Sequence, residues 1–222
     1  MSRPALRLTG RSSSHFTRVA AIFAHELGLP FELVVVHDLA SVDAATFGGN
    51  PALKVPTLHV GTSSVFGTEN ICRTLVELAG RAGDPRIVLT ESIADTVIRS
   101  AQELVWSAMS AQVQLRVGLS VAKLPADNVF FVKAAAGLNG ALTWLEQHLD
   151  DVRSRLPASR DLSLFEVTLF CLLEHIAFLP TISLEPFVRL REFASTFGER
   201  ASARKTPFRF DPVPSAPNKE TP

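Results

Sequence analysis

Residues 50–70 read Asn-Pro-Ala-Leu-Lys-Val-Pro-Thr-Leu-His-Val-Gly-Thr-Ser-Ser-Val-Phe-Gly-Thr-Glu-Asn, and the rest of the chain is organised around this stretch. Val55-Pro56 directly precedes a β-type run, Thr57 to Val60, and a proline can begin a strand but not continue one. A polar turn and a second short apolar run follow, which is typical of a hairpin. Thr68-Glu69-Asn70 then begins an apolar helical pattern, so we expect a helix whose polar N-terminus lies at the hairpin exit.

The two ends of this stretch predict a binding site for a small anion. A proline before an edge strand, if its peptide bond is cis, turns the chain so that a backbone amide and carbonyl face outward. The N-terminus of a helix binds anions because its first N–H groups lack partners and its dipole is positive there. Together, the two backbone groups and the helix end predict a place that holds a peptide-like carboxylate.

The residues before this stretch predict a βαβ unit. Ala5 to Leu8 alternates weakly as a short strand, and a helical pattern from Phe16 to Leu27 ends at Gly28 and Pro30. Phe31 to Val36 is a continuous apolar, β-branched run, which is typical of a strand buried on both faces. With the hairpin and the following helix, the order becomes β-α-β, connector, β-β-α. This order predicts a thioredoxin-like domain.

The second half of the chain predicts an all-α domain. Pro85 marks a linker, and long helical patterns follow from Glu91 to about Gly118 and from Asp127 to Arg155. The segment Leu164 to Phe178 is apolar almost all round, so we expect it at the centre of the domain. Ser163 and Glu166 have the spacing of a capping box, with Leu162 and Val167 as its hydrophobic staple. A last helix is expected around residues 186–197.

These patterns divide the chain into two domains and a tail. We expect a thioredoxin-like domain over residues 1–82 and an all-α domain over residues 88–207. Residues 208–222 are rich in Pro, Ser and Asn, a composition that predicts disorder.

Bulk composition excludes several classes of function. The 222 residues contain 22 Lys and Arg and 22 Asp and Glu, and this zero net charge argues against a nucleic-acid surface or a polybasic membrane anchor. No apolar run approaches the roughly 20 residues of a membrane span, and no signal-peptide block begins the chain. Cys72 and Cys171 lie in helical apolar patterns, which favours buried core thiols over a disulfide or metal site. We therefore expect a soluble cytoplasmic protein without a metal.

The motif Asn-Pro-x-x-Lys-Val-Pro-x-Leu, followed after the hairpin by Glu69 and a polar residue, resembles the glutathione-site signature of cytosolic glutathione S-transferases. The resemblance extends over nearly the whole chain, with one departure in the signature: Asn70 stands where the family usually has Ser. It implies a thioredoxin-like domain followed by an all-α domain. It also implies glutathione as co-substrate, a small hydrophobic electrophile, a homodimer and a role in detoxification.

Arg11-Ser12-Ser13-Ser14 precedes the first helix and carries the candidate chemistry. One interpretation is simple helix capping, for which serine is a preferred residue. The other is that one hydroxyl donates a hydrogen bond to a bound thiolate. The resemblance selects Ser14 as the catalytic residue, with Ser12 and Ser13 as backups. Phe16 stands where cysteine-type members carry Cys, and the chain contains no Tyr, so the resemblance is to bacterial-type, serine-type transferases.

The resemblance also assigns the remaining site residues. Val55, next to Pro56, would pair its backbone with the cysteinyl part of glutathione. Glu69 would meet the γ-glutamyl amine, and Asn70 with the helix N-terminus would hold the γ-glutamyl carboxylate. Lys54 would pair with the glycyl carboxylate, although an exposed lysine without a role is an equal alternative. Glu69 has an alternative too, as an acidic residue placed favourably in a first helical turn.

Three further residues have open interpretations. Trp106 and Met109 are candidate walls of the electrophile site between the domains, although at helical spacing such residues are more often core. His15 is interpreted as a solvent-facing helix residue rather than a catalyst.

Two other functions stay open. A non-catalytic binding or interaction protein of the same fold is favoured by Asn70 and by a serine loop that matches no transferase class cleanly. A glutathione-dependent isomerase would use the same glutathione site on a different substrate.

Overall fold

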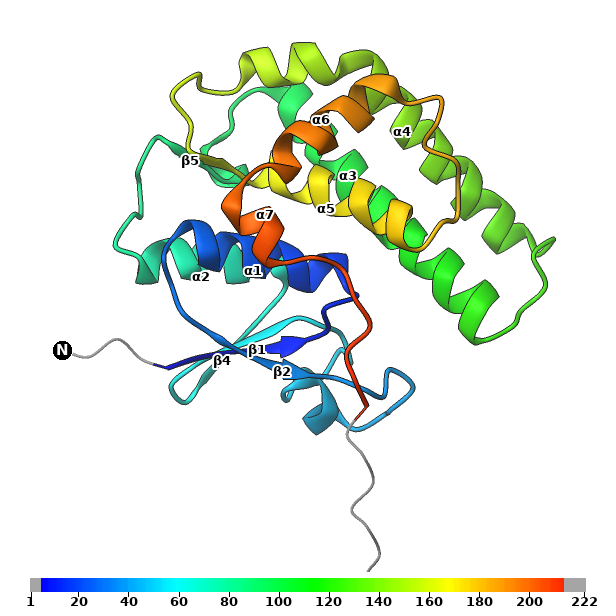
Figure 1. Cartoon of the computed structure of the whole chain (residues 1–222), viewed down its shortest axis with the longest axis horizontal. Helices are drawn as coiled ribbons and strands as arrows, with labels where there is room; N and C mark the ends of the chain where they lie inside the picture. The colour runs from blue at the N-terminus through cyan, green and yellow to red at the C-terminus, as the bar shows by residue number, and fades with distance from the viewer. Residues whose placement is uncertain (1–4, 214–222) are drawn as a thin grey trace, which may run out of the picture.

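The first half of the chain has the predicted order of strands and helices (Figure 1). The computed structural model describes residues 5–213. The elements of this half are β1 (Leu6–Gly10), α1 (His15–Glu26), β2 (Glu32–Val35), the 3-10 helix η1 (Ala44–Phe47), β3 (Thr57–Val60), β4 (Ser63–Phe66) and α2 (Thr68–Leu78).

The four strands form one mixed sheet in the order β2-β1-β3-β4. Leu8 of β1 lies opposite Leu33 in the parallel pair with β2 and opposite Leu58 in the antiparallel pair with β3. The β3–β4 hairpin places Leu58 opposite Val65. Helices α1 and α2 both lie between this sheet and the second half of the chain (Figure 1). This arrangement confirms the thioredoxin-like fold that the element order predicts.

Strand β2 differs from its prediction. The apolar run Phe31 to Val36 predicts a strand buried on both faces, but β2 lies at the edge of the sheet and pairs only with β1. Along Glu32–Val35 its residues alternate between exposed and half-buried. The prediction was wrong because the helices α1 and α2 cover only one face of the sheet. The side chains of β2 that point to the other face are therefore exposed to solvent.

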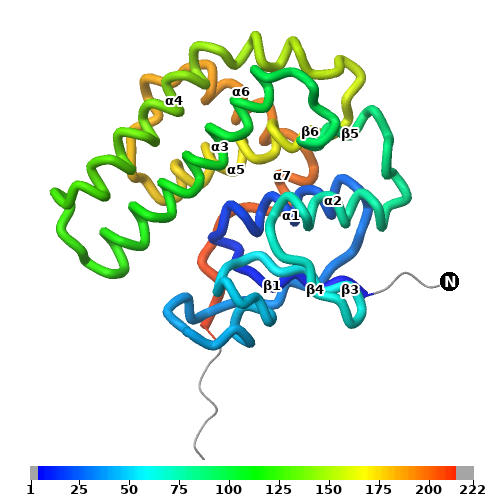
Figure 2. The backbone as a smooth tube through the Cα atoms, turned by 180° about the vertical axis from the view of Figure 1, so that it is seen from behind, coloured from blue at the N-terminus to red at the C-terminus, as the bar shows by residue number. Residues whose placement is uncertain are grey.

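The second half of the chain is helical (Figure 2). Its elements are β5 (Ile87–Val88), η2 (Thr90–Ser92), α3 (Thr96–Leu115), the π-helical turn η3 (Arg116–Val121), α4 (Val129–Arg155), β6 (Leu162–Ser163), α5 (Leu164–Phe178), α6 (Val188–Gly198) and α7 (Ala201–Lys205). Helices α3 and α4 form a long antiparallel pair, and α5 packs against α3, α6 and α1. Eleven of the α5 residues are buried, which confirms it as the centre of this half.

Helix α5 begins where the sequence predicts, but the capping contacts predicted for Ser163 and Glu166 do not form. Ser163 is the N-cap residue, yet its hydroxyl makes no capping hydrogen bond. Glu166 instead accepts hydrogen bonds from Arg160 at 2.8 Å and from Arg153 at 3.3 Å. The expected capping box is therefore absent at this helix, because charged partners outside the helix compete for the carboxylate.

The chain after α7 crosses back to the first half. Phe208 and Phe210 pack on Phe178 of α5, with ring centroids 5.7 and 5.1 Å apart, respectively. We expected disorder from residue 208 onward; residues 208–213 instead lie against the protein, because their aromatic side chains find an apolar surface. Residues 214–222 of the expected tail lie outside the described residues. Among residues 5–213, no helix combines the length and the apolar character that crossing a bilayer requires.

Candidate functional site

Asn50 holds the loop that leads into β3. Its side chain is 5% exposed, its amide donates to the Lys54 carbonyl at 2.9 Å, and its Oδ1 accepts from the Ala52 N–H at 2.9 Å. The Val55-Pro56 peptide bond that follows is cis, and the Lys54 side chain is exposed. Asn50 therefore positions the backbone of Val55. The sequence motif contains Asn50 but does not predict this role.

The N-terminus of α2 has no side-chain cap. Gly67 is its N-cap residue, with φ of 85°, a backbone conformation that favours glycine. Glu69 lies in the first turn, half-buried, with Asn70 beside it. Because no side chain caps this end, its first N–H groups are available to an anion.

Asn70 already has protein partners. Its amide donates to the Phe66 carbonyl at 3.2 Å, and its Oδ1 accepts from Arg73 at 3.1 Å. Arg73 is held in turn by Glu91, whose carboxylate lies 2.7 Å from its Nε. The Asn70 side chain is therefore turned toward the end of β4, and it leaves the backbone N–H groups of the helix uncovered.

A cavity of about 370 Å³ joins α1, α2 and α3. It is lined by Phe16, Gly67, Thr68, Glu69, Asn70 and Trp106. Phe16 and Trp106 stack with their ring centroids 6.0 Å apart and their planes within 9° of parallel. The structure thus brings Glu69, Asn70 and Trp106 together on one cavity, as the resemblance implies, and adds Phe16.

Met109 does not belong to this cavity. It is 0% exposed and packs in the core, so its expected place on the cleft wall is wrong. Met109 lies about one turn after Trp106 but on the face of α3 that the other helices bury, and helical spacing alone does not decide between the two faces.

The serine loop between β1 and α1 adopts a capping geometry. Ser14 is the N-cap residue of α1, and its hydroxyl oxygen accepts a hydrogen bond from the Thr17 N–H at 3.3 Å. Gly10 allows the close approach of β1 to the helix, because a Cβ at this position would lie 2.5 Å from Thr17 Oγ1. The Ser12 N–H donates to the Asp211 carboxylate at 2.8 Å. Ser12 and Ser14 thus have different partners.

His15 is buried, contrary to the expectation that it faces solvent. It is 1% exposed, and its ring centroid lies 4.3 Å from that of His175 on α5. Within residues 5–213, neither of its ring nitrogens has a hydrogen-bond partner. Burial lowers the pKa of His15 well below its ordinary value, and burial likewise lowers the pKa of His175 to about 4. Both imidazoles are therefore neutral at physiological pH.

The cysteines supply no nucleophile. Cys72 and Cys171 are free and buried, which confirms their interpretation as core thiols. Burial raises the pKa of the Cys72 thiol well above its ordinary value and that of Cys171 to about 12. A thiolate that takes part in chemistry at this protein must therefore come from a bound molecule.

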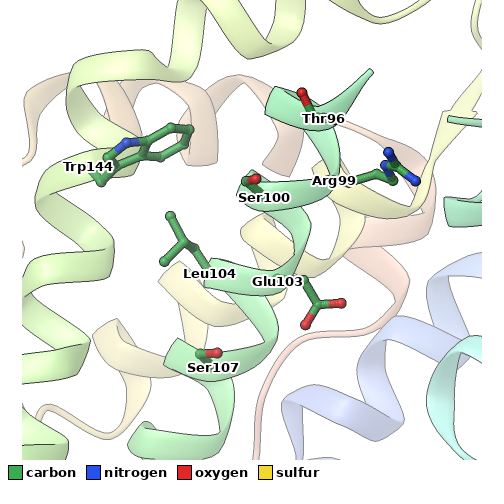
Figure 3. A pocket seen from close by; sticks show the side chains of 7 residues that line it. All are labelled: Thr96, Arg99, Ser100, Glu103, Leu104, Ser107 and Trp144. Carbon is green, nitrogen blue, oxygen red and sulfur yellow. The ribbon is translucent and has the colours of Figure 1, made fainter. Parts of the chain in front are cut away.

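A larger hollow of about 730 Å³ lies on the outer surface of α3 and α4. In Figure 3, Leu104 and Trp144 lie beside it, and Arg99 and Glu103 point away from Trp144. It contains none of the residues that the sequence predicts for the site, and it is open to solvent along one side of the helix pair.

Comparison with known proteins gives a family match for the first half of the chain. Residues 13–78 match the family model of the glutathione S-transferase N-terminal domain. Among curated proteins, none matches this sequence.

Solved structures extend the likeness to nearly the whole chain. A glutathione transferase family member from Pseudomonas fluorescens Pf-5, with bound glutathione, has a TM-score of 0.73 and 20% identity, covering 94% of this chain and 100% of that one. A glutathione S-transferase from Methylobacillus flagellatus KT, with glutathione bound, has a TM-score of 0.72 and 18% identity, covering 91% and 99%. One from Methylobacterium radiotolerans JCM 2831, in complex with glutathione sulfonate, has a TM-score of 0.71 and 18% identity, covering 96% and 99%. These likenesses show the glutathione S-transferase fold.

Proposed function

We propose that this protein binds reduced glutathione between α1, α2 and α3 and conjugates it, through its thiolate sulfur, to a small hydrophobic electrophile. The observation that carries the proposal is the uncapped N-terminus of α2, with Glu69 in its first turn, on the cavity that Phe16 and Trp106 line. One end of this cavity suits a carboxylate and an amine, and the other suits an apolar group.

Each residue of the site contacts a different part of glutathione. The first N–H groups of α2, with Asn70, hold the γ-glutamyl carboxylate, and Glu69 meets the γ-glutamyl amine. The backbone of Val55, before Pro56, pairs with the cysteinyl part of the tripeptide. Lys54 is exposed, with its ammonium free to reach the glycyl carboxylate.

Ser14 stabilises the thiolate. A free thiol has a pKa near 8.5, so only a few per cent is ionised at pH 7. Because the Ser14 oxygen accepts the Thr17 N–H, its own hydrogen remains available to donate to a sulfur. A hydrogen bond to an anion contributes roughly 1.5–3 kcal/mol and the helix N-terminus adds to it, which lowers the thiol pKa by about one or two units.

The electrophile occupies the aromatic end of the cavity. The thiolate attacks its electrophilic carbon, a carbon–sulfur bond forms, and the leaving group departs with the electron pair of the bond that breaks. Phe16 and Trp106 exclude water from one side of this reaction and favour an apolar substrate.

A non-catalytic binding role is the second candidate. The observation that favours it is that the Asn70 side chain is occupied by Phe66 and Arg73. A glutathione-dependent isomerase would use the same site, and only a profile of substrates separates it from a transferase.

A homodimer is part of the proposal. The hollow on α3 and α4, with the apolar side chains of Leu104 and Trp144 among its lining residues, supports a contact of these helices with a second copy. Ser100→Arg places a large charged side chain in this hollow and should shift the sedimentation coefficient toward the monomer. Ser110→Arg, on the same helix outside the hollow, is the matched control.

Calorimetric titration with reduced glutathione tests the binding site. We expect a dissociation constant between micromolar and low millimolar for the wild type, and a value at least tenfold weaker for Glu69→Ala, since a charged hydrogen bond is lost. Glu77→Ala removes an exposed carboxylate from the same helix and should bind as the wild type does. Absence of binding to the wild type at several millimolar, with no thermal shift, would contradict the proposal.

A further inference from the structure

Arg73 links the first turn of α2 to the second half of the chain. Its Nη1 donates to Asn70 Oδ1 at 3.1 Å, and its Nε and Nη2 donate to the two carboxylate oxygens of Glu91 at 2.7 and 3.1 Å. Glu91 lies in η2, whereas Asn70 precedes Arg73 by three positions on α2. Because a guanidinium is planar and presents its N–H groups in a fixed fork, one side chain serves both partners at once. Glu91 therefore fixes the direction of Arg73, and Arg73 fixes the position of the Asn70 oxygen.

The contact with Arg73 holds the Asn70 side chain away from the free N–H groups of its own helix. An asparagine side chain hydrogen-bonds readily to its own or neighbouring backbone N–H groups, and for this reason it caps helices. The first backbone hydrogen bond of α2 is donated by Ile71 to the Gly67 carbonyl, at 2.9 Å, so the N–H groups before Ile71 lack helical partners. Since the Asn70 oxygen lies on Arg73 and its nitrogen on the Phe66 carbonyl, Asn70 caps none of them.

We propose that Arg73 is a positioning residue of the glutathione site: oriented by Glu91, it holds the Asn70 side chain off the N-terminus of α2, so that the backbone N–H groups stay open to the γ-glutamyl carboxylate. This inference rests on the proposed function for the identity of the ligand, but the hold on Asn70 does not depend on a ligand. Asn70 takes part in binding through its backbone N–H. On this account Asn70, the one departure from the family signature, is compatible with binding because Arg73 controls its side chain.

The charge of Arg73 offers a different explanation, in which a cation one turn from the site attracts the carboxylate. Two observations argue against it. The Glu91 carboxylate, 2.7 Å away, already balances the charge of Arg73. The two side chains are also 40% and 47% exposed, respectively, so that solvent and salt screen what remains. We therefore assign the role of Arg73 to its geometry.

Two variants separate geometry from charge. Arg73→Lys keeps the positive charge but loses the fork, because an ammonium on a flexible stem does not hold Asn70 and Glu91 in one fixed arrangement. Asn70→Ala removes the side chain on which Arg73 acts. Arg155→Lys is the matched control: Arg155 is 41% exposed and likewise joins two carboxylates, one on its own helix α4 and one at the start of α3. It does not line the cavity.

The first readout is calorimetric titration with reduced glutathione. Arg73→Lys should bind about fivefold more weakly than the wild type, because the released Asn70 oxygen competes with the ligand with the strength of a helix cap. In the Asn70→Ala background the same change should have no effect, since no side chain is left to hold. Arg155→Lys should bind as the wild type does. The pH at which the bound thiol ionises, followed by ultraviolet titration, should stay the same in Arg73→Lys, because Ser14 is intact.

The second readout is amide hydrogen exchange over residues 68–70 without ligand, followed by NMR. A cap formed by the released Asn70 side chain should slow exchange at these N–H groups in Arg73→Lys. Simple loss of helix stability would have the opposite effect, because fraying speeds exchange. Arg155→Lys should exchange as the wild type does over these residues.

Wild-type affinity of Arg73→Lys would overturn the inference, because its charge alone would then suffice. An equal loss of affinity with and without the Asn70 side chain would overturn it too, as would faster exchange over residues 68–70. Failure of the proposed function has a different signature: the wild type would bind no glutathione, while slower exchange in Arg73→Lys would still support the hold on Asn70.

Discussion

The carboxylate of Asp211 accepts a hydrogen bond from the Ser12 N–H at 2.8 Å, across 199 positions of sequence. Phe208 and Phe210 anchor the segment that carries it on Phe178. The serine loop is therefore tied to the chain after α7 through Asp211, and the helix that follows the loop packs on α5 through His15 and His175. The contact with Asp211 also places a negative charge beside the loop on which we expect a thiolate.

We expect Asp211→Asn to increase the ionised fraction of bound glutathione. The amide keeps an acceptor for the Ser12 N–H but removes the charge, and removal of one nearby charge is worth on the order of 1 kcal/mol, or about fivefold. The thiol titration should move to lower pH, and turnover at neutral pH should rise. Asp150→Asn, which removes a carboxylate that is 75% exposed, is the control. A titration that stays in place, or moves to higher pH, would show that Asp211 does not act on the thiol through its charge.

Ser14→Ala should lower turnover about ten- to a thousandfold, because one hydrogen bond to the developing anion is lost. Glutathione affinity should change little, since the α2 residues are intact. The variant also loses a helix cap, worth about 1 kcal/mol of stability. Ser14→Asp separates the two effects: it accepts the Thr17 N–H but has no hydrogen to donate, so it should be stable and inactive. Full activity of Ser14→Ala, with loss in Ser12→Ala or Ser13→Ala, would assign the role to another serine.

The sequence predicts those features of this fold that depend on neighbouring residues. The hairpin after Pro56 and the start of α2 at Thr68 follow from turn residues and periodicity, and both are confirmed. The meeting of Glu69 and Trp106 on one cavity follows from the resemblance alone. Local patterns describe an element and its faces, but they do not say which element covers each face.

The features that the sequence does not predict depend on contacts between distant elements. His15 follows three serines and has the sequence context of a surface residue, yet α5 covers it. Asp211 lies in a segment whose composition predicts disorder, but Phe208 and Phe210 give that segment an apolar anchor. The only sequence signal for this contact is the pair of aromatic residues beside the carboxylate.

The two candidate wall residues of α3 should respond differently to truncation. Met109→Ala leaves a void in the core and should lower the free energy of unfolding by about 2–5 kcal/mol, with kcat and KM of the folded enzyme unchanged. Trp106→Ala removes the partner of Phe16 in the cavity and should raise KM for an apolar electrophile several-fold, with a smaller loss of stability. Urea unfolding and steady-state kinetics measure the two effects. A raised KM in Met109→Ala, with none in Trp106→Ala, would restore Met109 to the site.

The buried histidines predict a loss of stability in mild acid. The pKa of His175 is lowered to about 4 in the folded protein, whereas a histidine in the unfolded chain titrates near 6.5. Between these values the unfolded chain binds a proton that the folded protein does not, so stability is fully present above about pH 6.5 and is lost as the pH falls. His15, whose pKa is also lowered by burial, adds to the loss in the same direction. The paired carboxylates with lowered pKa, Glu26 and Glu166, contribute at lower pH, because unfolded carboxyl groups titrate near pH 4.

Urea unfolding at pH 7 and pH 5 measures this dependence. The proton that His175 binds in the unfolded chain should by itself lower the free energy of unfolding by about 2 kcal/mol from pH 7 to pH 5. His175→Gln should reduce the difference by about that amount, because the variant has no proton to bind at this position. Thr168→Val, a buried change on the same helix without a titratable group, should lower stability equally at both pH values. A wild-type stability that is the same at pH 5 and pH 7, or higher at pH 5, would mean that the imidazole of His175 becomes protonated inside the fold.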